Sequence, residues 1–345
     1  MKGSQGSRSR FHSCAALIGA AAALYGGAAS AAGFYNDGKV FLTGGVFTVD
    51  GAGGGGAVPW ATITGYETKD GINGGVAYTY ANLPALQLNV FGGAVGFYDR
   101  FELSYATHNL SLNLSNLDTV ALAAEAAGLE LGTDPWNSTL KMDVYGAKLR
   151  LFGDAVYTSD SWIPQVAIGG LYKENKSKEL VATLGAAESK DWEAYVAATK
   201  VFFPLSTLVN LTVRYTSANE IGLTGFGVCE QGGECKNDKE FRFEASIAHL
   251  LTKNTAIGAE YQQHGGNLDG RSVDIAGLNL TGLTNLLGGG ISDALKQEKE
   301  GDWKDFFFAY APNKNLSFVL AYLMLGNISV APDQNGYYLS VHATF

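Results

Sequence analysis

The last nine residues, Tyr337–Phe345, read YYLSVHATF and decide the fold that we expect. Apolar and polar residues alternate along this stretch, and a β-strand points successive side chains to opposite faces. The apolar face of such a strand carries Tyr337, Leu339, Val341, Ala343 and Phe345, and the polar face carries Ser340, His342 and Thr344. A wall between lipid and water needs one apolar and one polar face. The stretch therefore predicts the closing strand of a transmembrane antiparallel up-and-down β-barrel.

The other end of the chain is typical of a secretory signal peptide. Lys2, Arg8 and Arg10 precede an apolar stretch over residues 14–24, and small residues follow over 28–32. An uncleaved membrane anchor is the alternative, but the apolar stretch is short for a spanning helix. We expect cleavage after residue 31 or 32.

Charge excludes one class of partner. The formal net charge is −9, and loss of the three basic residues of the signal peptide, with no acidic one, makes it more negative still. Such a chain does not attract the phosphates of nucleic acid. The expected organisation is a signal peptide, 1–32, followed by a single outer-membrane barrel domain, 33–345.

Strand-length segments recur along the whole of residues 33–345. No stretch there approaches eighteen uninterrupted apolar residues, so spanning helices are excluded and strands must do the spanning. Alternation and turn signals predict about fourteen strands, with twelve to sixteen possible. Their expected ranges are 40–49, 60–67, 74–81, 85–98, 101–112, 141–152, 163–172, 192–203, 208–218, 240–250, 256–263, 303–311, 316–325 and 336–345.

The connections between these strands are of two kinds. Most even-to-odd junctions are short, such as Asp99-Arg100, whereas four odd-to-even junctions are long: 113–140, 173–191, 219–239 and 264–302. Outer-membrane barrels have short periplasmic turns and long extracellular loops. A soluble β-sandwich, the alternative for this Gly-rich composition, has no reason to sort its loops in this way. We therefore expect periplasmic termini and long extracellular loops.

Several charged residues fall on the predicted inner face. Strand 240–250 alternates most cleanly, with Phe241 and Phe243 facing lipid and Arg242 and Glu244 facing inward. By the same rule we expect the lumen to be lined by Glu102, Lys148, Arg150, Arg214, Arg242, Glu244 and Glu260. Mixed signs indicate weak ion selectivity and passage of small polar solutes. Pairing of these charges across strands, merely to hold the wall, is the alternative.

A barrel of about fourteen strands encloses a water-filled lumen unless a segment folds into it. The candidate plug is the Leu-rich stretch 278–295 in the longest loop, and a second helical piece is expected at 117–129. Both are equally compatible with outward surface loops. The faces of strands 192–203 and 303–311 remain open because their alternation is poor.

Catalytic and cofactor signals are weak. His108, His249, His264 and His342 lack the spacing of metal ligands, and the Gly-rich runs lack the Lys-Ser/Thr of a phosphate loop, so no cofactor, metal or enzymatic activity is predicted. Cys229 and Cys235 flank a Gly-Gly turn in a long loop of an exported chain. A disulfide that stiffens this loop is expected, with a zinc pair as the weaker alternative.

Several motifs resemble those of an uncharacterised family of Gram-negative bacteria, domain of unknown function 3034. The resemblance spans nearly the whole chain after the signal peptide and rests on LTGGV (42–46), GGGAVPW (54–60), AVGFYDR (94–100), YGAKLRLFGD (145–154), YTSDSW (157–162) and DWKD (302–305). It implies an outer-membrane barrel and assigns no functional residues.

Three functions follow as hypotheses. The first is a passive or weakly selective outer-membrane channel for small polar solutes. The second is a plugged barrel with a structural or adhesive role, and the third is an outer-membrane enzyme that modifies lipid. The expected partners are outer-membrane lipid and lipopolysaccharide, and the barrel-insertion machinery through the strand that ends in Phe345. The exposed aromatic faces are also compatible with a homo-oligomer.

Overall fold

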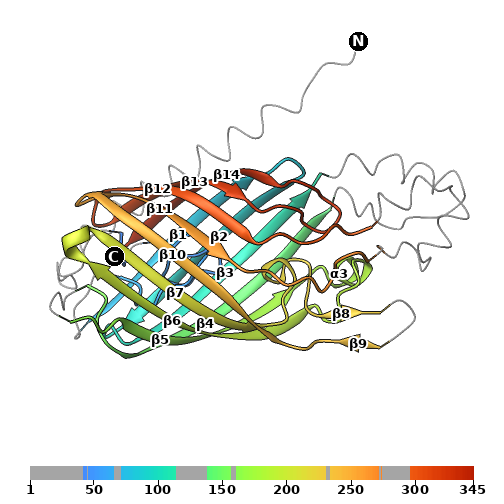
Figure 1. Cartoon of the computed structure of the whole chain (residues 1–345), viewed down its shortest axis with the longest axis horizontal. Coiled ribbons are helices and arrows are strands. Elements are labelled where there is room, and N and C mark those ends of the chain that lie inside the picture. Colours follow the sequence, from blue (N-terminus) through green and yellow to red (C-terminus); the bar gives the residue numbers. More distant parts are fainter. Residues whose placement is uncertain are drawn as a thin grey trace, which may run out of the picture.

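A closed antiparallel barrel dominates the computed structural model (Figure 1), which describes residues 42–44, 46–65, 71–113, 138–156, 161–230, 234–271, 273 and 296–345. The strands of the barrel are β1 (Ile72–Asn82), β2 (Leu86–Phe97), β3 (Phe101–Leu112), β4 (Thr139–Phe152), β5 (Gln165–Asn175), β6 (Lys190–Phe202), β7 (Thr207–Thr216), β10 (Glu240–Thr252), β11 (Thr255–Gln262), β12 (Trp303–Asn313), β13 (Leu316–Met324) and β14 (Asn335–Thr344). Each pairs with its neighbours in the chain, and β1 pairs with β14 from Gly75↔Thr344 to Asn82↔Tyr337. This last pairing closes the barrel and leaves no free sheet edge.

The remaining elements are short and lie in connections. A small two-stranded sheet is formed by β8 (Val228–Cys229) and β9 (Cys235–Lys236), and the described helical turns are α3 (Lys178–Thr183), η3 (Phe203–Leu205) and η4 (Glu220–Gly222). Among the described residues, no helix is long and apolar enough to cross a membrane.

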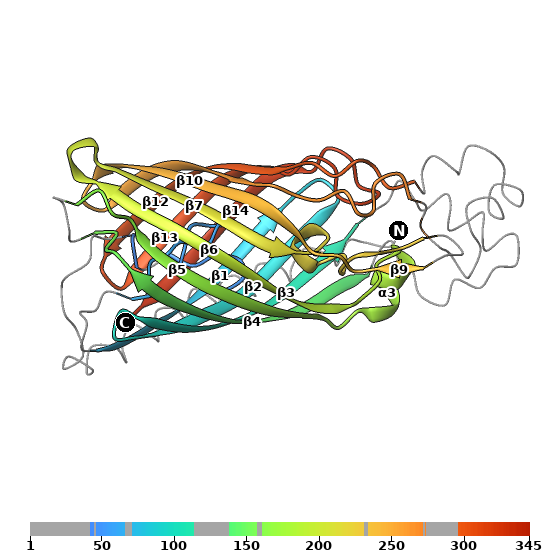
Figure 2. The same ribbon diagram turned by 60° about the horizontal axis from the view of Figure 1, so that its bottom comes forward.

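The strand count corrects one expectation. Twelve of the predicted segments form the barrel within the described residues, each close to its expected range, but 40–49 and 60–67 do not join the wall. Described residues 42–44 and 46–65 instead lie inside the barrel, as the blue segment in Figure 2 shows. The predicted number of about fourteen strands was therefore too high.

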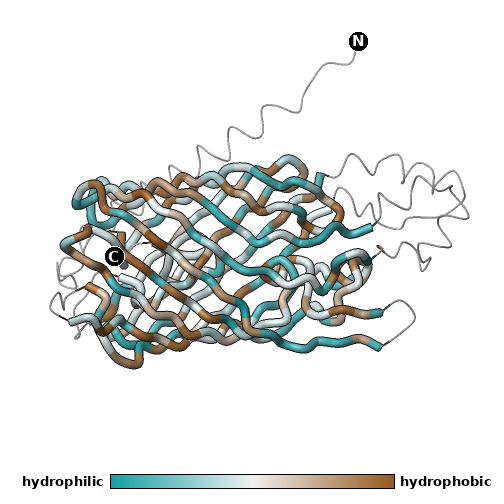
Figure 3. Tube along the Cα trace, viewed as in Figure 1, coloured by the Kyte–Doolittle hydropathy of each residue, from teal (hydrophilic) through white to brown (hydrophobic). Residues whose placement is uncertain are grey.

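Burial confirms the predicted faces of the strands. Along β10, Phe241 and Phe243 are exposed while Arg242 and Glu244 are buried, and β14 alternates in the same way. Figure 3 shows the resulting alternation of hydrophobic and hydrophilic residues along the strands. In β12, whose register the sequence left open, Phe306 and Phe308 face outward and Phe307 faces inward.

The two ends of the barrel differ, as expected from the loop lengths. Short connections such as Tyr98–Arg100 and 253–254 lie at one end, which we call the turn end, and β14 finishes there with the C-terminus (Figure 1). The four longest connections lie at the opposite end, the loop end, which also holds the short connection 83–85, and the turn end holds one longer connection, 153–164. The predicted signal peptide and the stretches 117–129 and 278–295 lie outside the described residues.

Candidate functional site

The interior of the barrel is occupied by residues 42–44 and 46–65, which we call the inner segment. Its backbone and side chains contact inward-facing residues of β3, β4, β5, β6, β7, β10, β11 and β14. Val58 and Ala61 are completely buried. The inner segment is thus held by most of the circumference of the wall rather than by one strand.

The strongest attachment joins the inner segment to β3 and β4. Lys148 Nζ donates to the carbonyl oxygens of Gly53, Trp60 and Thr62 at 2.8, 3.1 and 2.8 Å. Beside it, the Glu102 carboxylate accepts from the backbone N–H groups of Gly53 at 3.0 Å and Thr64 at 2.8 Å. Lys148 and Glu102 also form an ion pair at 3.1 Å, and both are buried. A single pair of wall charges therefore holds two separate stretches of the inner segment by charge-assisted hydrogen bonds.

The opposite wall holds the middle of the inner segment. Glu260 of β11 accepts from the Ala57 N–H at 2.7 Å and from the Ser246 hydroxyl at 2.8 Å. The indole N–H of Trp60 donates to the same Ser246 hydroxyl at 3.0 Å. Gly55 permits this approach, because a Cβ at its position would lie 1.9 Å from Glu260 Oε1.

A network of buried charges surrounds Asp50 of the inner segment. Lys173 Nζ lies 3.0 Å from Asp50 and 3.2 Å from Glu193, and it also donates to the Ile221 carbonyl at 2.8 Å. Arg214 bonds to Glu193 at 2.8 Å and to Glu244, and lies 3.6 Å from Asp50. Buried charges need such pairing because desolvation costs several kcal/mol per ion.

The seven residues predicted to line the lumen are all buried on the inner face, but they do not bound an open channel. Glu102, Lys148 and Glu260 bind the inner segment, and Arg214 pairs with Glu244. Arg242 donates to the Ala218 carbonyl at 2.6 Å, and Arg150 pairs with Asp99 and Asp154 in connections at the turn end.

Lys173 and Asp50 were missed at the sequence level. Lys173 was assigned to a loop, although the inward alternation of β5 continues through Gly169 and Leu171 to this residue. That continuation was the available signal. Asp50 had none, because its partners are distant in sequence.

Two apolar cavities lie on either side of the inner segment. The cavity toward the turn end is lined by residues such as Leu42, Trp60, Leu208 and Phe307, and the cavity toward the loop end by residues such as Leu86, Leu88, Leu110 and Leu323. Gly56 lines both cavities, so this part of the inner segment stands between them.

The loop end carries three buried titratable groups outside the strands. Both oxygens of Glu300 are buried, and burial together with the nearby Asp269 carboxylate raises the pKa of Glu300 to about 8. Burial also raises the pKa of Glu220, helped by the charge of Glu300. Burial lowers the pKa of His264, whose ring stacks on Trp303 with 4.4 Å between the ring centroids.

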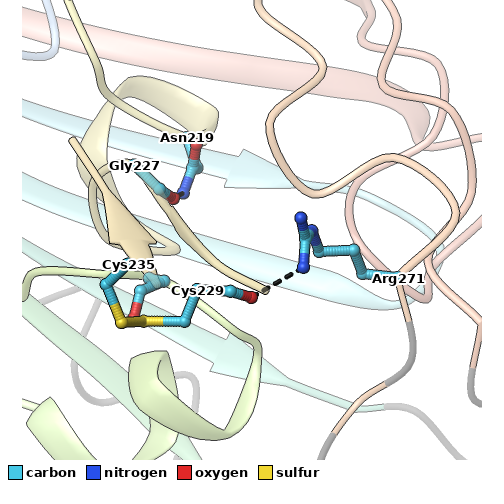
Figure 4. The surroundings of a disulfide bond; sticks show 6 residues. Asn219, Gly227, Cys229, Cys235 and Arg271 are labelled. Atoms are coloured by element: carbon cyan, nitrogen blue, oxygen red, sulfur yellow. Dashed lines mark hydrogen bonds between the residues drawn. A yellow bond between two sulfur atoms is a disulfide. The ribbon is translucent and has the colours of Figure 1, made fainter. Parts of the chain in front are cut away.

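The connection between β7 and β10 is cross-linked by a disulfide between Cys229 and Cys235 (Figure 4). Arg271 Nη1 donates to the Cys229 carbonyl at 2.6 Å, and the Asn219 side chain donates to the Gly227 carbonyl at 2.8 Å. The Arg271 bond ties the connection to the segment that follows β11, and the Asn219 bond lies within the connection.

Ser340 and His342, which share the inner face of β14, each have other partners. The hydroxyl groups of Ser340 and Thr79 are hydrogen-bonded at 2.6 Å, and His342 Nδ1 accepts from the Phe47 N–H of the inner segment at 3.2 Å. Neither contact orients His342 toward Ser340 as a general base would require.

These observations define a class of protein: a closed twelve-stranded antiparallel barrel with an apolar exterior and an interior filled by its own N-terminal region. The family described as "Protein of unknown function (DUF3034)" matches residues 43–342, and the chain belongs to this family. No curated protein matches the chain.

Solved structures with a similar fold include porins and a phospholipase. The KdgM porin has a TM-score of 0.43 and 10% identity, with 79% of this chain and 99% of that chain covered. The NanC porin has a TM-score of 0.46 and 7% identity, with coverage of 79% and 98%. The outer membrane phospholipase A of Escherichia coli has a TM-score of 0.35 and 10% identity, with coverage of 81% and 92%. Similarities this low carry no argument about the function of this chain.

Proposed function

We propose that the protein is an outer-membrane channel for small solutes. In the conformation described above, the inner segment closes this channel. The exposed residues of the strands are largely apolar, as a lipid-facing wall requires, and the turn end and loop end then correspond to the periplasmic and extracellular sides. In this setting lipid and lipopolysaccharide cover residues such as Leu211 and Phe243, and the strand ending in Phe345 meets the insertion machinery.

The observation that carries this proposal is the position of Gly56 between two cavities. If the inner segment moved aside, the turn-end and loop-end cavities would join along the axis of the barrel. Polar contacts of the inner segment with the wall support a movable closure. Lys148 donates to its carbonyl groups, Glu102 and Glu260 accept from its N–H groups, and Lys173 pairs with Asp50. Each such bond has a modest net strength.

The lining modifies the expected solute. The wall charges that would select small polar solutes are engaged with the inner segment or with one another, whereas the surface that the two cavities present is almost wholly apolar. We therefore propose that the solute has an apolar body and that the wall charges serve mainly to hold the closure.

Conductance in a planar bilayer tests this function. The double variant Lys148→Met with Glu102→Gln removes the main attachment without leaving a buried unpaired charge. Loss of even one of these hydrogen bonds is worth about 1.4 kcal/mol, so we expect the open probability to rise about tenfold or more over that of the wild-type protein.

The matched control lies on the same strand. Arg150→Met with Asp99→Asn removes a buried ion pair of β4 that contacts the turn end and not the inner segment. It should conduct like the wild-type protein. Equal conductance of both double variants and the wild-type protein would contradict a gated channel and favour a permanently closed barrel with a structural or adhesive role.

A further inference from the structure

The loop-end cavity has the composition of a binding site for a small molecule. Its volume is about 60 Å³, and its surface is almost wholly apolar. Leucines from β2, β3 and β13 form much of the lining, together with Val49 and Ala57 of the inner segment. Ligand sites are typically apolar cavities with a few converging polar groups.

Six polar atoms in this lining lack hydrogen-bond partners among the described residues, and four of them belong to Glu220, Thr224 and Trp303. The other two are Asp305 Oδ1 of β12 and the hydroxyl of Tyr338 of β14. Asp305 is 3% exposed and Tyr338 is 5% exposed. An unpaired buried polar atom costs about 1–3 kcal/mol, so both atoms call for a partner.

The described part of the chain does not supply that partner. Asp305 lies directly across from Glu260 in the pairing of β11 with β12, and the Glu260 oxygens are already engaged with Ala57 and Ser246. The Tyr338 hydroxyl is directed at Gly56, because a Cβ there would lie 2.0 Å from it, and the Gly56 N–H and carbonyl provide no bond to it. Both unpaired atoms therefore remain available on one cavity wall.

We propose that the loop-end cavity binds a small apolar molecule that carries a single hydroxyl group, of the phenol or short alcohol class. A hydroxyl both donates and accepts, so it can donate to Asp305 Oδ1 and accept from the Tyr338 hydroxyl. An apolar body of modest size fills the leucine-lined space. A protonated amine could donate to both atoms, but it cannot accept and would leave the Tyr338 O–H without an acceptor. The inference deepens the proposed channel function by naming the class of its solute.

Direct binding to the full-length protein in detergent tests this inference. The probes are 4-fluorobenzyl alcohol and 4-fluorotoluene, which differ by the hydroxyl group and are followed by ¹⁹F NMR against empty micelles. We expect saturable binding of the alcohol and binding at least about tenfold weaker of the toluene, the value of one buried hydrogen bond.

Two variants locate the site. Tyr338→Phe removes the hydroxyl and keeps the ring, and Asp305→Leu replaces the carboxylate by an apolar side chain of similar size that cannot accept, so each should weaken alcohol binding about tenfold and leave toluene binding unchanged. Tyr322→Phe is the control, because Tyr322 lies on the neighbouring strand β13 and is 39% exposed on the outer face. Heat-dependent gel mobility verifies that every variant is folded.

The outcomes separate this inference from the channel function. Absence of saturable binding, equal affinity for the two probes, or unchanged alcohol affinity in Tyr338→Phe and Asp305→Leu would each overturn it. The binding measurement needs no ion flow, so failure of the conductance test with selective alcohol binding would remove the gated channel and leave the binding site in place.

Discussion

Glu300 lies in the connection before β12, and both of its carboxylate oxygens are buried without a hydrogen-bond partner among the described residues. Burial and the Asp269 carboxylate raise its pKa from 4.5 to about 8, so folding favours the neutral acid. The contribution of neutral Glu300 to the stability of the folded state is therefore complete below pH 4.5 and is lost as the pH rises through 8. We expect local stability around residues 297–303 to fall by on the order of 1–3 kcal/mol across this interval, measured by hydrogen exchange corrected for intrinsic rates.

Substitution of this residue provides the control. Glu300→Gln should reduce the pH dependence, leaving the part that Glu220 contributes, whereas Glu298→Gln should not change it because Glu298 is exposed. If the local stability of Glu300→Gln changed with pH as much as that of the wild-type protein, groups other than Glu300 would be responsible for the pH dependence.

At the scale of single residues, the sequence predicted which face of the wall a side chain occupies better than it predicted which residues that side chain contacts. The period of two along a strand placed Lys148 and Glu102 on the inner face, because orientation depends only on neighbours in the chain. Their partners Gly53, Trp60 and Thr62 are 86–95 positions away from Lys148. Nothing local in the sequence records such a contact, so an open charged lumen and a filled one look alike before the structure is known.

At the scale of elements, the same reasoning explains the two surplus strands. Segments 40–49 and 60–67 are rich in β-forming residues, and apolar and polar residues alternate in part along them. The same pattern suits an extended segment inside the barrel that contacts polar residues of the wall on one side and apolar residues on the other. Ten of the twelve barrel strands were predictable because length, alternation and turn signals agreed, and 192–203 and 303–311 were predictable from length and turn signals alone. The inner segment satisfied only length and alternation, and its Gly-rich stretch 51–56 makes close contacts inside the barrel instead of a surface loop.

The inner segment packs closely against specific glycines of the wall. Substitution of one of these glycines tests whether the wall fixes the position of the inner segment. A Cβ at Gly96 of β2 would lie 2.4 Å from the Thr64 carbonyl oxygen, so Gly96→Ala should push the end of the inner segment away. We expect amide exchange over residues 61–64 to accelerate about tenfold or more while exchange in the barrel strands stays constant. Gly170→Ala is the control, since a Cβ there meets nothing closer than 3.6 Å. Unchanged exchange in Gly96→Ala would mean that the wall does not fix this end.

At the scale of the whole molecule, the proposed location in a bilayer depends on the apolar exterior. Leu211 at the middle of β7 is 61% exposed, and Leu205 in the turn before β7 is 66% exposed, so a soluble barrel would tolerate a charge at either position about equally. In a membrane the positions differ, because a charge at the midplane must enter hydrocarbon while one at the interface stays hydrated.

We therefore expect Leu211→Arg to lower the free energy of unfolding by about 2–4 kcal/mol and Leu205→Arg by about 0–1 kcal/mol, measured by guanidinium titration of the protein refolded into lipid vesicles. The pair is matched in residue type and exposure, so the difference reports depth in the bilayer and not loss of packing. Equal effects of the two substitutions would show that the apolar belt of the barrel does not face hydrocarbon, and the channel function would then lose its physical setting.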